Sequence, residues 1–475
     1  MRWILILMLL NFTKLYSQNW EIVAEVNTGI STIIEDEVND RLLVSGSFTY
    51  LNNVPFSTIA FYDGNNFDSL QCGIGSLCGN VLPLGGISGA WRVIYYENKL
   101  ITTGSFGIAS NIETAGLAYY ENNTWNSFGT GLLLNNGNWG MGRYLSKDSN
   151  YVYLCGTFDS INGVPAQSVA IYNGTTWYEP ENLTSVRPNL PNGFNTVQSY
   201  KDYLYLSGTF CDNENPERKI CRLARFKDGE WSGVGNGIFS GLGYVNSMVV
   251  YKDKLIVGGT MSTSQGDPGN GLAAWDGNTW DNMGGGVYYS SVVQVNDMAV
   301  HGDFLYVLGL FEAAGGKEAQ GLARWDGTNW CRLDSFEIYI NNAIAIGFFN
   351  DTLFASGYLF SNEGVSRRLI KWLPPFQISN CGNTTSINEP KQNNVFTIYP
   401  NPTNNLVNVQ FNALFSGSIL ICDISGRLLG SKEVKNVSNT SVTLADCAQG
   451  IYFVTVAGNN NERQTLKLIK QGDGF

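Results

Sequence analysis

Histidine is almost absent from this sequence of 475 residues, in which His301 is the only one. A single imidazole excludes metal centres built from several histidines and catalysis that needs two imidazoles. Metal sites built from histidines are therefore not expected. Asp212–Asn213–Glu214–Asn215 offers oxygen ligands for Ca²⁺ but lacks the fuller D-x-D-x-D-G pattern, so no metal site and no cofactor is assigned. His301 stands between the apolar runs VNDMAV and FLYV, which predicts a surface position in a turn between two strands.

Charge is also scarce. Charged residues make up 15% of the chain, the formal net charge is −11, and no cluster of Lys or Arg occurs. Because nucleic acid is a polyanion that binds to basic surfaces, a nucleic-acid partner is not expected.

Long apolar runs are missing after the first residues, so no transmembrane segment is predicted. At the start, Arg2 precedes an apolar run over residues 3–10 and a polar exit. This pattern predicts a signal peptide over residues 1–17, although Leu15 departs from the small-residue rule near the cleavage site.

Nine cysteines then belong to an oxidising compartment, where disulfides form. Two local pairs are the main disulfide candidates, and two more distant pairs are possible in addition. The local pairs are Cys72 with Cys78 and Cys211 with Cys221; the distant pairs are Cys331 with Cys381 and Cys422 with Cys447. Cys155, inside an apolar strand, is left as a buried free thiol.

Glycine and aromatic residues are abundant, with 54 glycines and 13% aromatics. Seven glycines end similar apolar phrases such as VSGSF and LSGTF, at positions 46, 104, 156, 208, 259, 309 and 357. Their successive gaps are 58, 52, 52, 51, 50 and 48 residues. A period near fifty is typical of four-stranded propeller blades, so the sequence predicts an all-β, seven-bladed β-propeller.

A second phrase recurs as LAAWDGNTW at 272–280 and LARWDGTNW at 322–330. The Asp–Gly letters predict a two-residue type I′ hairpin between the third and fourth strands of a blade. In that register a small Ala323 would lie opposite the large Trp330. The same small–large pairing is predicted for Ala60/Phe67, Ala118/Trp125, Ala170/Trp177, Ala224/Trp231 and Ala273/Trp280.

The seventh copy of the phrase stops at Trp372, because Pro374 and Pro375 cannot continue a ladder. The segment NWEIVAEVNTGI that includes Trp20 resembles the missing fourth strand. We therefore expect the start of the chain to complete the last blade and to close a propeller over residues 18–375.

These repeats resemble kelch propellers in their length and in the glycine that ends the second strand, with a double glycine at Gly258–Gly259. The WDGNTW hairpin is also similar in position to the Asp-box of sialidases. Both resemblances imply architecture alone.

From about residue 390 the pattern changes to short alternating strands with Asn, Gly and Ser turns, which predicts a small immunoglobulin-like β-sandwich. Four motifs follow in order: YPNP at 399–402, D-x-x-G-R at 423–427, GIYFV at 450–454 and KLIK at 467–470. The segment resembles the C-terminal sorting domain of type IX (Por) secretion substrates. The residues that carry this sorting motif are Tyr399, Pro400, Asn401, Pro402, Gly426 and Gly450.

This resemblance implies a sorting domain over residues 393–475, joined by a polar linker over 376–392, with the type IX machinery as partner. It also implies entry by the Sec route and delivery to the medium or to the outer-membrane surface of a Gram-negative bacterium.

Long loops between second and third strands and between blades share one face of a propeller, so a ligand site is expected there. Aromatic residues assigned to these loops are the candidate binding residues for a glycan or protein ligand. They are Trp139, Tyr178, Tyr288, Tyr289 and Tyr339.

An enzyme such as a glycosidase or lyase is the alternative, because loop carboxylates could converge at the ring centre. The nearest acids are Asp159, Asp212, Glu214, Glu312 and Glu363. No spacing singles out a pair, so no catalytic residue is assigned and a binding role is favoured. The third hypothesis is a surface protein that binds no ligand.

Overall fold

The computed structural model describes residues 20–36, 39–69, 89–183, 194–211, 217, 220–238, 244–319, 321–331, 333, 340–361, 364–372, 396–423, 427–445, 447–458 and 463–471. The predicted signal peptide and linker lie outside these ranges. The chain divides into two compact units, within residues 1–383 and 384–475. The described residues of both units form β-strands, as predicted, and the first unit also contains the short 3-10 helix η3 (Thr263–Gln265).

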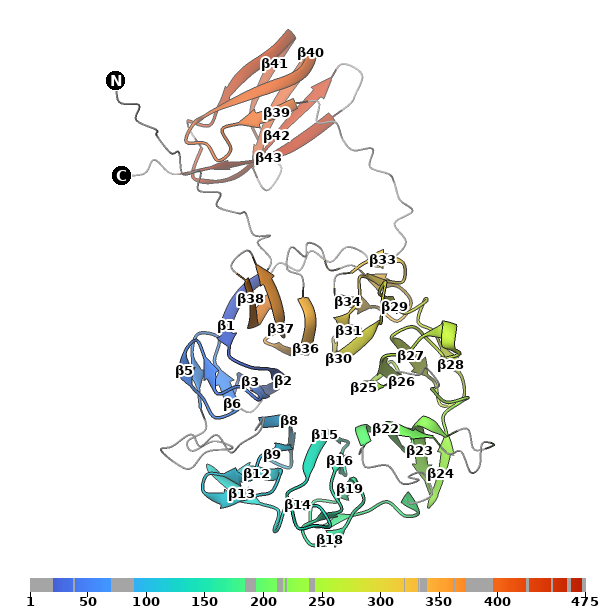
Figure 1. Ribbon diagram of the computed structural model, residues 1–475. Helices are drawn as coiled ribbons and strands as arrows, with labels where there is room; N and C mark the ends of the chain where they lie inside the picture. The colour runs from blue at the N-terminus through green and yellow to red at the C-terminus, as the bar shows by residue number, and fades with distance from the viewer. Residues whose placement is uncertain are drawn as a thin grey trace, which may run out of the picture. The chain divides into compact units, whose positions relative to one another are not determined.

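Within its described residues, the first unit contains six four-stranded antiparallel sheets and one six-stranded sheet. In Figure 1 the first strand of each sheet faces the middle of a ring and the later strands lie further out. The arrangement is β-propeller-like.

The sheets share one strand order, so their strands are grouped here by position. The first, innermost strands are β2 (Ile30–Asp36), β8 (Gly89–Tyr96), β15 (Met141–Lys147), β21 (Phe194–Tyr200), β25 (Val245–Tyr251), β30 (Gln294–His301) and β36 (Ile340–Phe349). The second strands are β3 (Arg41–Gly46), β9 (Lys99–Ser105), β16 (Val152–Thr157), β22 (Tyr203–Cys211), β26 (Lys254–Gly259), β31 (Phe304–Leu310) and β37 (Thr352–Ser361). The third strands are β6 (Ile59–Tyr62), β12 (Leu117–Glu121), β19 (Val169–Tyr172), β23 (Cys221–Lys227), β27 (Leu272–Trp275), β34 (Leu322–Trp325) and β38 (Gly364–Trp372). The fourth strands are β7 (Phe67–Asp68), β13 (Thr124–Ser127), β20 (Trp177–Tyr178), β24 (Glu230–Gly233), β28 (Trp280–Asp281), β35 (Trp330–Cys331) and β1 (Trp20–Val26).

Short hairpins fill several connections between second and third strands. They are β4 (Tyr50–Leu51) with β5 (Val54–Pro55), β10 (Ile108–Ala109) with β11 (Ile112–Glu113), β17 (Ser160–Ile161) with β18 (Val164–Pro165), and β32 (Ala313–Ala314) with β33 (Lys317–Glu318). Strands that lead from one sheet to the next pair with these hairpins: β14 (Leu132–Leu133) with β17, β29 (Val287–Tyr288) with β32, and β1 with β4. Backbone hydrogen bonds therefore join neighbouring sheets.

Buried apolar side chains form a cluster between each pair of neighbouring sheets. One cluster combines Ile256 of β26 and Leu272 of β27 with Val307 of β31. Another combines Val44 of β3 with Phe354 of β37. It lies between the sheet that begins with β2 and the sheet that contains both β1 and β38. The hydrophobic core is thus a ring of inter-sheet layers.

In the hairpins that join third and fourth strands, the residues pair in a different register from the predicted one. Trp325 pairs with Trp330, and Arg324 with Cys331, so Ala323 does not lie opposite Trp330 as predicted. Each hairpin places two aromatic residues directly opposite each other: Tyr62/Phe67, Tyr120/Trp125, Tyr172/Trp177, Phe226/Trp231, Trp275/Trp280 and Trp325/Trp330. Such cross-strand aromatic pairs stabilise antiparallel sheets.

The turn chemistry explains the error. In WDGNTW the Oδ1 of Asp276 accepts the backbone N–H groups of Asn278 and Thr279, at 2.7 and 2.6 Å, and so builds a four-residue turn. These N–H groups hold the pKa of Asp276 down, at about 2. The two-residue turn with positive φ at both positions occurs instead at Asn122 and Asn123 and at Asp228 and Gly229.

The predicted partner of the strand ending at Trp372 is present. β1 runs antiparallel to β38 with Trp20 paired to Trp372, and the blue β1 lies beside the orange β38 in Figure 1. The two indoles meet edge to face with centroids 4.8 Å apart. The aromatic pair of the other hairpins is therefore supplied here by residues from distant parts of the chain.

The described residues of the second unit form five strands in one hydrogen-bonded sheet. They are β39 (Phe396–Tyr399), β40 (Leu406–Asp423), β41 (Leu428–Thr443), β42 (Gly450–Gly458) and β43 (Arg463–Lys470). Two irregular steps of pairing bend the long β40 and β41 between residues 410 and 417. The bend lets all five strands contribute to one buried cluster around Phe396, Val409 and Val454.

Candidate functional site

The inner strands depart from regular pairing at one equivalent place. In β8, Ala90 pairs with Gly104 and Arg92 with Thr103, so Trp91 is the extra residue of a β-bulge. The extra residues of the other bulges are Ser31, Arg143, Asn195, Asn246 and Asn296, and Ile344 holds the corresponding place in β36.

The bulge explains most of the repeated glycines; an exception is Gly208, where an added Cβ would lie 3.2 Å from Cδ1 of Phe210. A Cβ atom added to Gly309 would lie 2.0 Å from the carbonyl oxygen of Gln294, at the start of the bulged strand. The same close approach, at 1.7–2.1 Å, occurs at Gly46, Gly104, Gly156 and Gly259. Only glycine leaves room for a neighbouring backbone at this distance.

The bulged residues surround a central cavity of about 720 Å³. Its lining combines two arginines, three aromatic rings and several amides and hydroxyls. The lining residues are Ser31, Trp91, Arg92, Arg143, Tyr144, Asn195, Thr209, Tyr244, Asn246, Gln294, Asn296 and Ile344. None of these described lining residues is acidic. The pair of carboxylates that the enzyme hypothesis requires is therefore not found among them.

A polar network lies beneath the cavity. Nη2 of Arg92 is 3.9 Å from Oδ1 of Asp297, and the guanidinium lies over the ring of Tyr144 at 4.5 Å. Asp297 also accepts the backbone N–H of Ile346 at 3.2 Å and the hydroxyl of Ser247 at 3.5 Å.

Burial dominates the electrostatics of this network. It raises the pKa of Asp297 above its ordinary value, although the nearby Arg92 acts in the opposite direction. Burial also raises the pKa of Tyr144. The network fixes the position of Arg92, which in turn donates to the carbonyl of Ser31 at 3.1 Å.

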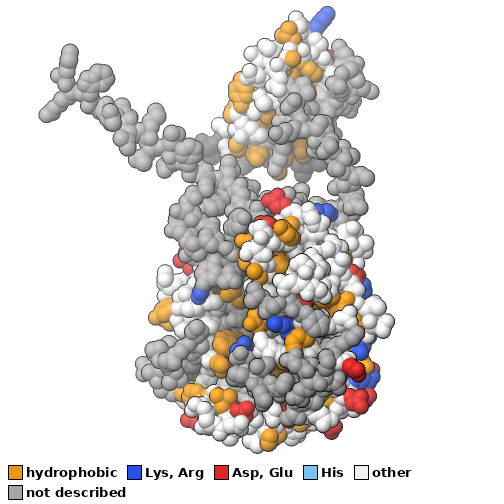
Figure 2. Space-filling model, turned by 45° about the vertical axis from the view of Figure 1, so that its right-hand side comes forward, with side chains coloured by type: hydrophobic (Ala, Val, Ile, Leu, Met, Phe, Trp, Pro, Cys, Tyr) orange, Lys and Arg blue, Asp and Glu red, His pale blue; other side chains and the backbone are white. Residues whose placement is uncertain are grey.

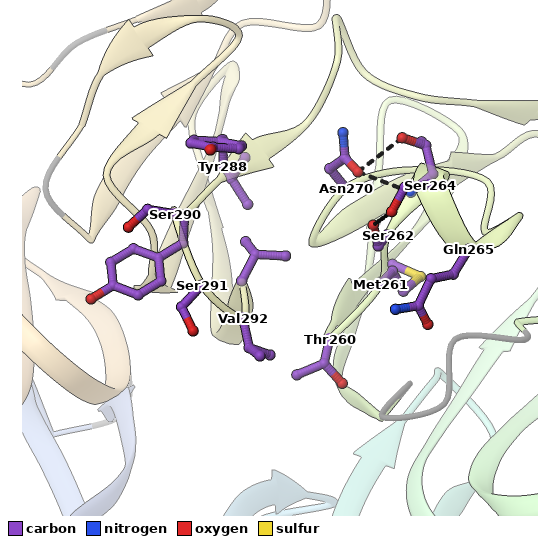
Figure 3. A pocket seen from close by; sticks show the side chains of 14 residues that line it. Thr260, Met261, Ser262, Ser264, Gln265, Asn270, Tyr288, Ser290, Ser291 and Val292 are labelled. Atoms are coloured by element: carbon purple, nitrogen blue, oxygen red, sulfur yellow. Dashed lines mark hydrogen bonds between the residues drawn. The ribbon is translucent and has the colours of Figure 1, made fainter.

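A second cavity, of about 470 Å³, lies between the β26–β27 connection and the segment that leads from β29 to β30. Figure 3 shows Tyr288, Ser290 and Val292 on one side and the connection that carries η3 on the other. On that side Asn270 accepts the N–H and hydroxyl of Thr263, at 2.9 and 3.0 Å. Two predicted binding residues, Tyr288 and Tyr289, line this cavity.

The other predicted aromatics lie elsewhere. Trp139 is exposed and packs against the backbone of Gly107. Tyr178 belongs to β20 rather than to a loop, and it pairs with Ile171 beside the hairpin turn. Neither residue lines either cavity. Tyr339 lies outside the described residues, and the binding role of all five remains a prediction.

Sequence reasoning missed the central residues because it searched loops, whereas these side chains lie within strands. The sequence does contain a signal for them, because these positions recur with nearly the spacing of the repeated glycine. Positions 31, 91, 143, 195, 246, 296 and 344 are separated by 60, 52, 52, 51, 50 and 48 residues.

The cysteines follow the predicted pattern in part. Cys211 and Cys221 form a disulfide between β22 and β23, and Cys155 is a buried free thiol. Cys331 is disulfide-bonded, and its predicted partner Cys381 lies outside the described residues, as do Cys72 and Cys78.

The alternative pair Cys422–Cys447 is wrong, because both thiols are free. Cys422 pairs with Phe453, on the sheet face opposite to Ile421 and Val454. Cys447 packs against the buried cluster on the Val454 face, so the sheet separates the two thiols.

In the second unit the terminal motifs contact one another. Asn401, in the YPNP turn, accepts the backbone N–H of Ile469 at 2.9 Å, and Thr403 bridges to Lys470. The ammonium of the buried Lys470 donates to the carbonyls of Leu444 and Cys447. In the D-x-x-G-R turn, Arg427 donates its N–H to Asp423 at 3.1 Å, while Gly426 lies outside the described residues.

Residues 397–471 match the family model of the secretion system C-terminal sorting domain. The second unit is a sorting domain. It indicates export by the type IX secretion system to the cell surface or the medium. The described part of the chain contains no helix whose length and apolar character would suit a membrane span.

No curated protein matches the chain in sequence. Among solved structures, the extracellular domain of the one-component system protein BT4673 from B. thetaiotaomicron is similar over 95% of this chain and 58% of its own length, with 9% identity and a TM-score of 0.45. The chain thus spans little more than half of that domain.

Two further structures resemble the chain. The β-propeller domain of the Trilobed protease from Pyrococcus furiosus covers 76% of this chain and 100% of its own, with 10% identity and a TM-score of 0.42. The Trypanosoma rangeli sialidase in complex with 2,3-difluorosialic acid covers 81% and 84%, with 10% identity and a TM-score of 0.34. At such identities the likeness concerns the fold alone.

Proposed function

We propose that the chain is an exported, kelch-like seven-bladed β-propeller that binds a glycan in its central cavity. Seven blades are supported by the shared strand order, by the inter-sheet clusters and by the pairing of β1 with β38. The propeller spans residues 18–375, after a signal peptide over 1–17 that directs the Sec route. A linker over 376–392 leads to the immunoglobulin-like sorting domain over 393–475, which delivers the protein to the surface of a Gram-negative cell or to the medium.

The observation that carries the binding role is variation at the bulges. Where the repeats pack, they keep one residue type, such as the fully buried alanine at Ala60, Ala118 and Ala323. At the bulge the type varies around the ring: Asn recurs in three units, at Asn195, Asn246 and Asn296, whereas other units carry Trp91 or Arg143. Packing alone would favour similar residues at equivalent positions, whereas a ligand without sevenfold symmetry needs different ones.

The chemistry of the lining suits a sugar. A half-buried Trp91 offers an apolar face to a pyranose ring, and the amides of Asn195, Asn246 and Asn296 can exchange hydrogen bonds with hydroxyl groups. Some of these amides are already positioned: Nδ2 of Asn246 donates to the carbonyl of Val295 at 3.0 Å. Preorganised polar groups of this kind lower the entropy lost on binding.

Screening the whole chain against a glycan array, followed by calorimetry on the best ligand, tests the proposal. Trp91→Ala is expected to weaken binding by roughly tenfold or more, because a central aromatic contact is commonly a hot spot. Trp139→Ala separates this site from the loop aromatics predicted from the sequence. Because Trp139 is exposed and lines neither cavity, this variant should bind like the unchanged chain if the glycan lies in the central cavity.

Absence of binding to every glycan would contradict the proposal. Full affinity in Trp91→Ala would show that a bound glycan lies outside the central cavity. The thermal transition of each variant shows that it is folded before its affinity is compared.

A further inference from the structure

The sign of charge in the central cavity differs from that of the whole chain. The formal net charge is −11, and the face drawn in Figure 2 shows acidic and basic side chains interspersed among uncharged ones. The cavity lining holds Arg92 and Arg143 and no acidic residue. A concave site with charge of one sign concentrates ligands of the opposite sign.

Arg92 is already engaged by the protein. Its guanidinium faces the carboxylate of Asp297, lies over Tyr144 and donates to the carbonyl of Ser31. These contacts hold it in the floor of the cavity.

Arg143 is in a different position. It is the exposed extra residue of the bulge in β15, and its Nη1 is 3.5 Å from Oδ1 of Asn195, a weak neutral acceptor. No carboxylate among the described residues forms an ion pair with it. Among the described residues, therefore, no carboxylate balances the positive charge that Arg143 brings to the wall of the cavity.

The backbone that carries Arg143 is fixed. A Cβ added to the preceding Gly142 would lie 1.7 Å from Oγ1 of Thr103, so β15 packs tightly against the neighbouring second strand β9. The fixed backbone limits the region that the guanidinium can reach, and its planar fork can make two parallel hydrogen bonds to one planar anion.

We infer that the glycan bound here is acidic, with a uronic acid whose carboxylate is held by Arg143 and whose ring lies against Trp91. This inference rests on the proposed function, because it specifies the ligand class of the same cavity. A carboxylate supplies one negative charge in a planar group, which matches the guanidinium of Arg143. The amides of Asn195 and Asn246, from the next two inner strands, then face the hydroxyl groups.

A matched pair of ligands isolates the carboxylate: an oligogalacturonate and the same oligomer as its methyl ester. Calorimetry with the whole chain should show binding of the acid that is about tenfold to a hundredfold tighter than binding of the ester, since a hydrogen bond to a charged group is stronger than one to a neutral group. Glucuronate and mannuronate oligomers with their esters extend the test to other ring geometries.

The variant Arg143→Gln removes the charge and keeps hydrogen-bonding capacity. It is expected to bind acid and ester with similar affinity. Lys227→Gln removes one positive charge from the outer part of β23, where Lys227 pairs with Asp202 at 3.6 Å, and it should keep the preference for the acid.

The outcomes separate this inference from the proposed function. Equal binding of acid and ester by the unchanged chain, with loss in Trp91→Ala, would overturn the acidic ligand and leave a glycan site. Preference for a sulfated galactan oligomer over every uronate would also overturn the assignment to a carboxylate. Failure to bind any acidic or neutral oligomer would overturn both.

Discussion

At the scale of single residues, Asp297 shows how burial and charge compete under the central cavity. Burial raises its pKa more strongly than Arg92 lowers it. A carboxyl group whose pKa is higher in the folded than in the unfolded protein stabilises the fold at low pH. That contribution is fully present below the unfolded value of 3.8 and is lost as the pH rises through the folded value.

The variant Asp297→Asn removes this titration. An amide does not reproduce the hydrogen bonds of the protonated carboxyl group with Ser247 and the backbone N–H of Ile346, so we expect the variant to be less stable at low pH. The deficit in free energy of unfolding should be largest below pH 3.8 and should shrink towards neutral pH, by about 1.4 kcal/mol for each unit of pKa elevation. Urea unfolding of both proteins between pH 3.5 and 7 measures the difference. A deficit that grows with pH would show that Arg92 outweighs burial.

Single residues also mark where sequence reasoning succeeded and failed. The residue types of the hairpin turns were predicted, but the letters Asp–Gly are compatible with two turns. A side-chain oxygen that captures two N–H groups, as in Asp276, converts a two-residue turn into a four-residue one and shifts the register. Whether the turn has two or four residues depends on these hydrogen bonds, which a short sequence motif does not specify.

At the scale of elements, the bulge determines both the repeated glycine and the direction of the cavity side chains. An extra residue in the inner strand re-aims one side chain and brings a carbonyl oxygen against the second strand. The sequence shows the glycine at Gly309 and its equivalents clearly. The bulge itself is harder to recognise, because only three of its residues are alike, Asn195, Asn246 and Asn296, whereas Trp91 and Arg143 hold the same place in other strands. The candidate site was therefore less predictable than the fold.

The variant Gly309→Ala tests this relation. Its new Cβ would lie 2.0 Å from the carbonyl oxygen of Gln294, so one strand must move. We expect the propeller to lose about 1–3 kcal/mol of stability or more, as in other overpacked sites. Gly29→Ala is the matched control, because its Cβ would meet only the Cδ1 atom of Ile344 at 3.4 Å, an ordinary contact. Thermal unfolding of both variants measures the difference, and equal midpoints would contradict the explanation.

At the scale of the whole molecule, the first unit depends on a pairing between strands that are distant in sequence. This pairing could be predicted because the repeated motif that ends at Trp372 lacks a fourth strand, and the segment around Trp20 resembles one. Across the seam, Glu21 forms an ion pair with Lys371 at 3.1 Å and Glu25 with Arg368 at 3.5 Å. Exposed ion pairs contribute little to stability, so the backbone ladder and the two indoles provide most of the closure.

A covalent link across the seam tests the closure. Glu21 pairs directly with Lys371 in the ladder, and cysteines at opposed positions of antiparallel strands lie within the range of a disulfide. The double variant Glu21→Cys/Lys371→Cys should therefore oxidise spontaneously and raise the thermal midpoint, with an upper limit of about 6 kcal/mol for a loop of this length. Mass spectrometry detects the bond, and Glu21→Cys alone, heated with and without reductant, separates its effect from that of the native disulfides. If no bond forms in the folded double variant, β1 does not lie beside β38 and the ring is closed in another way.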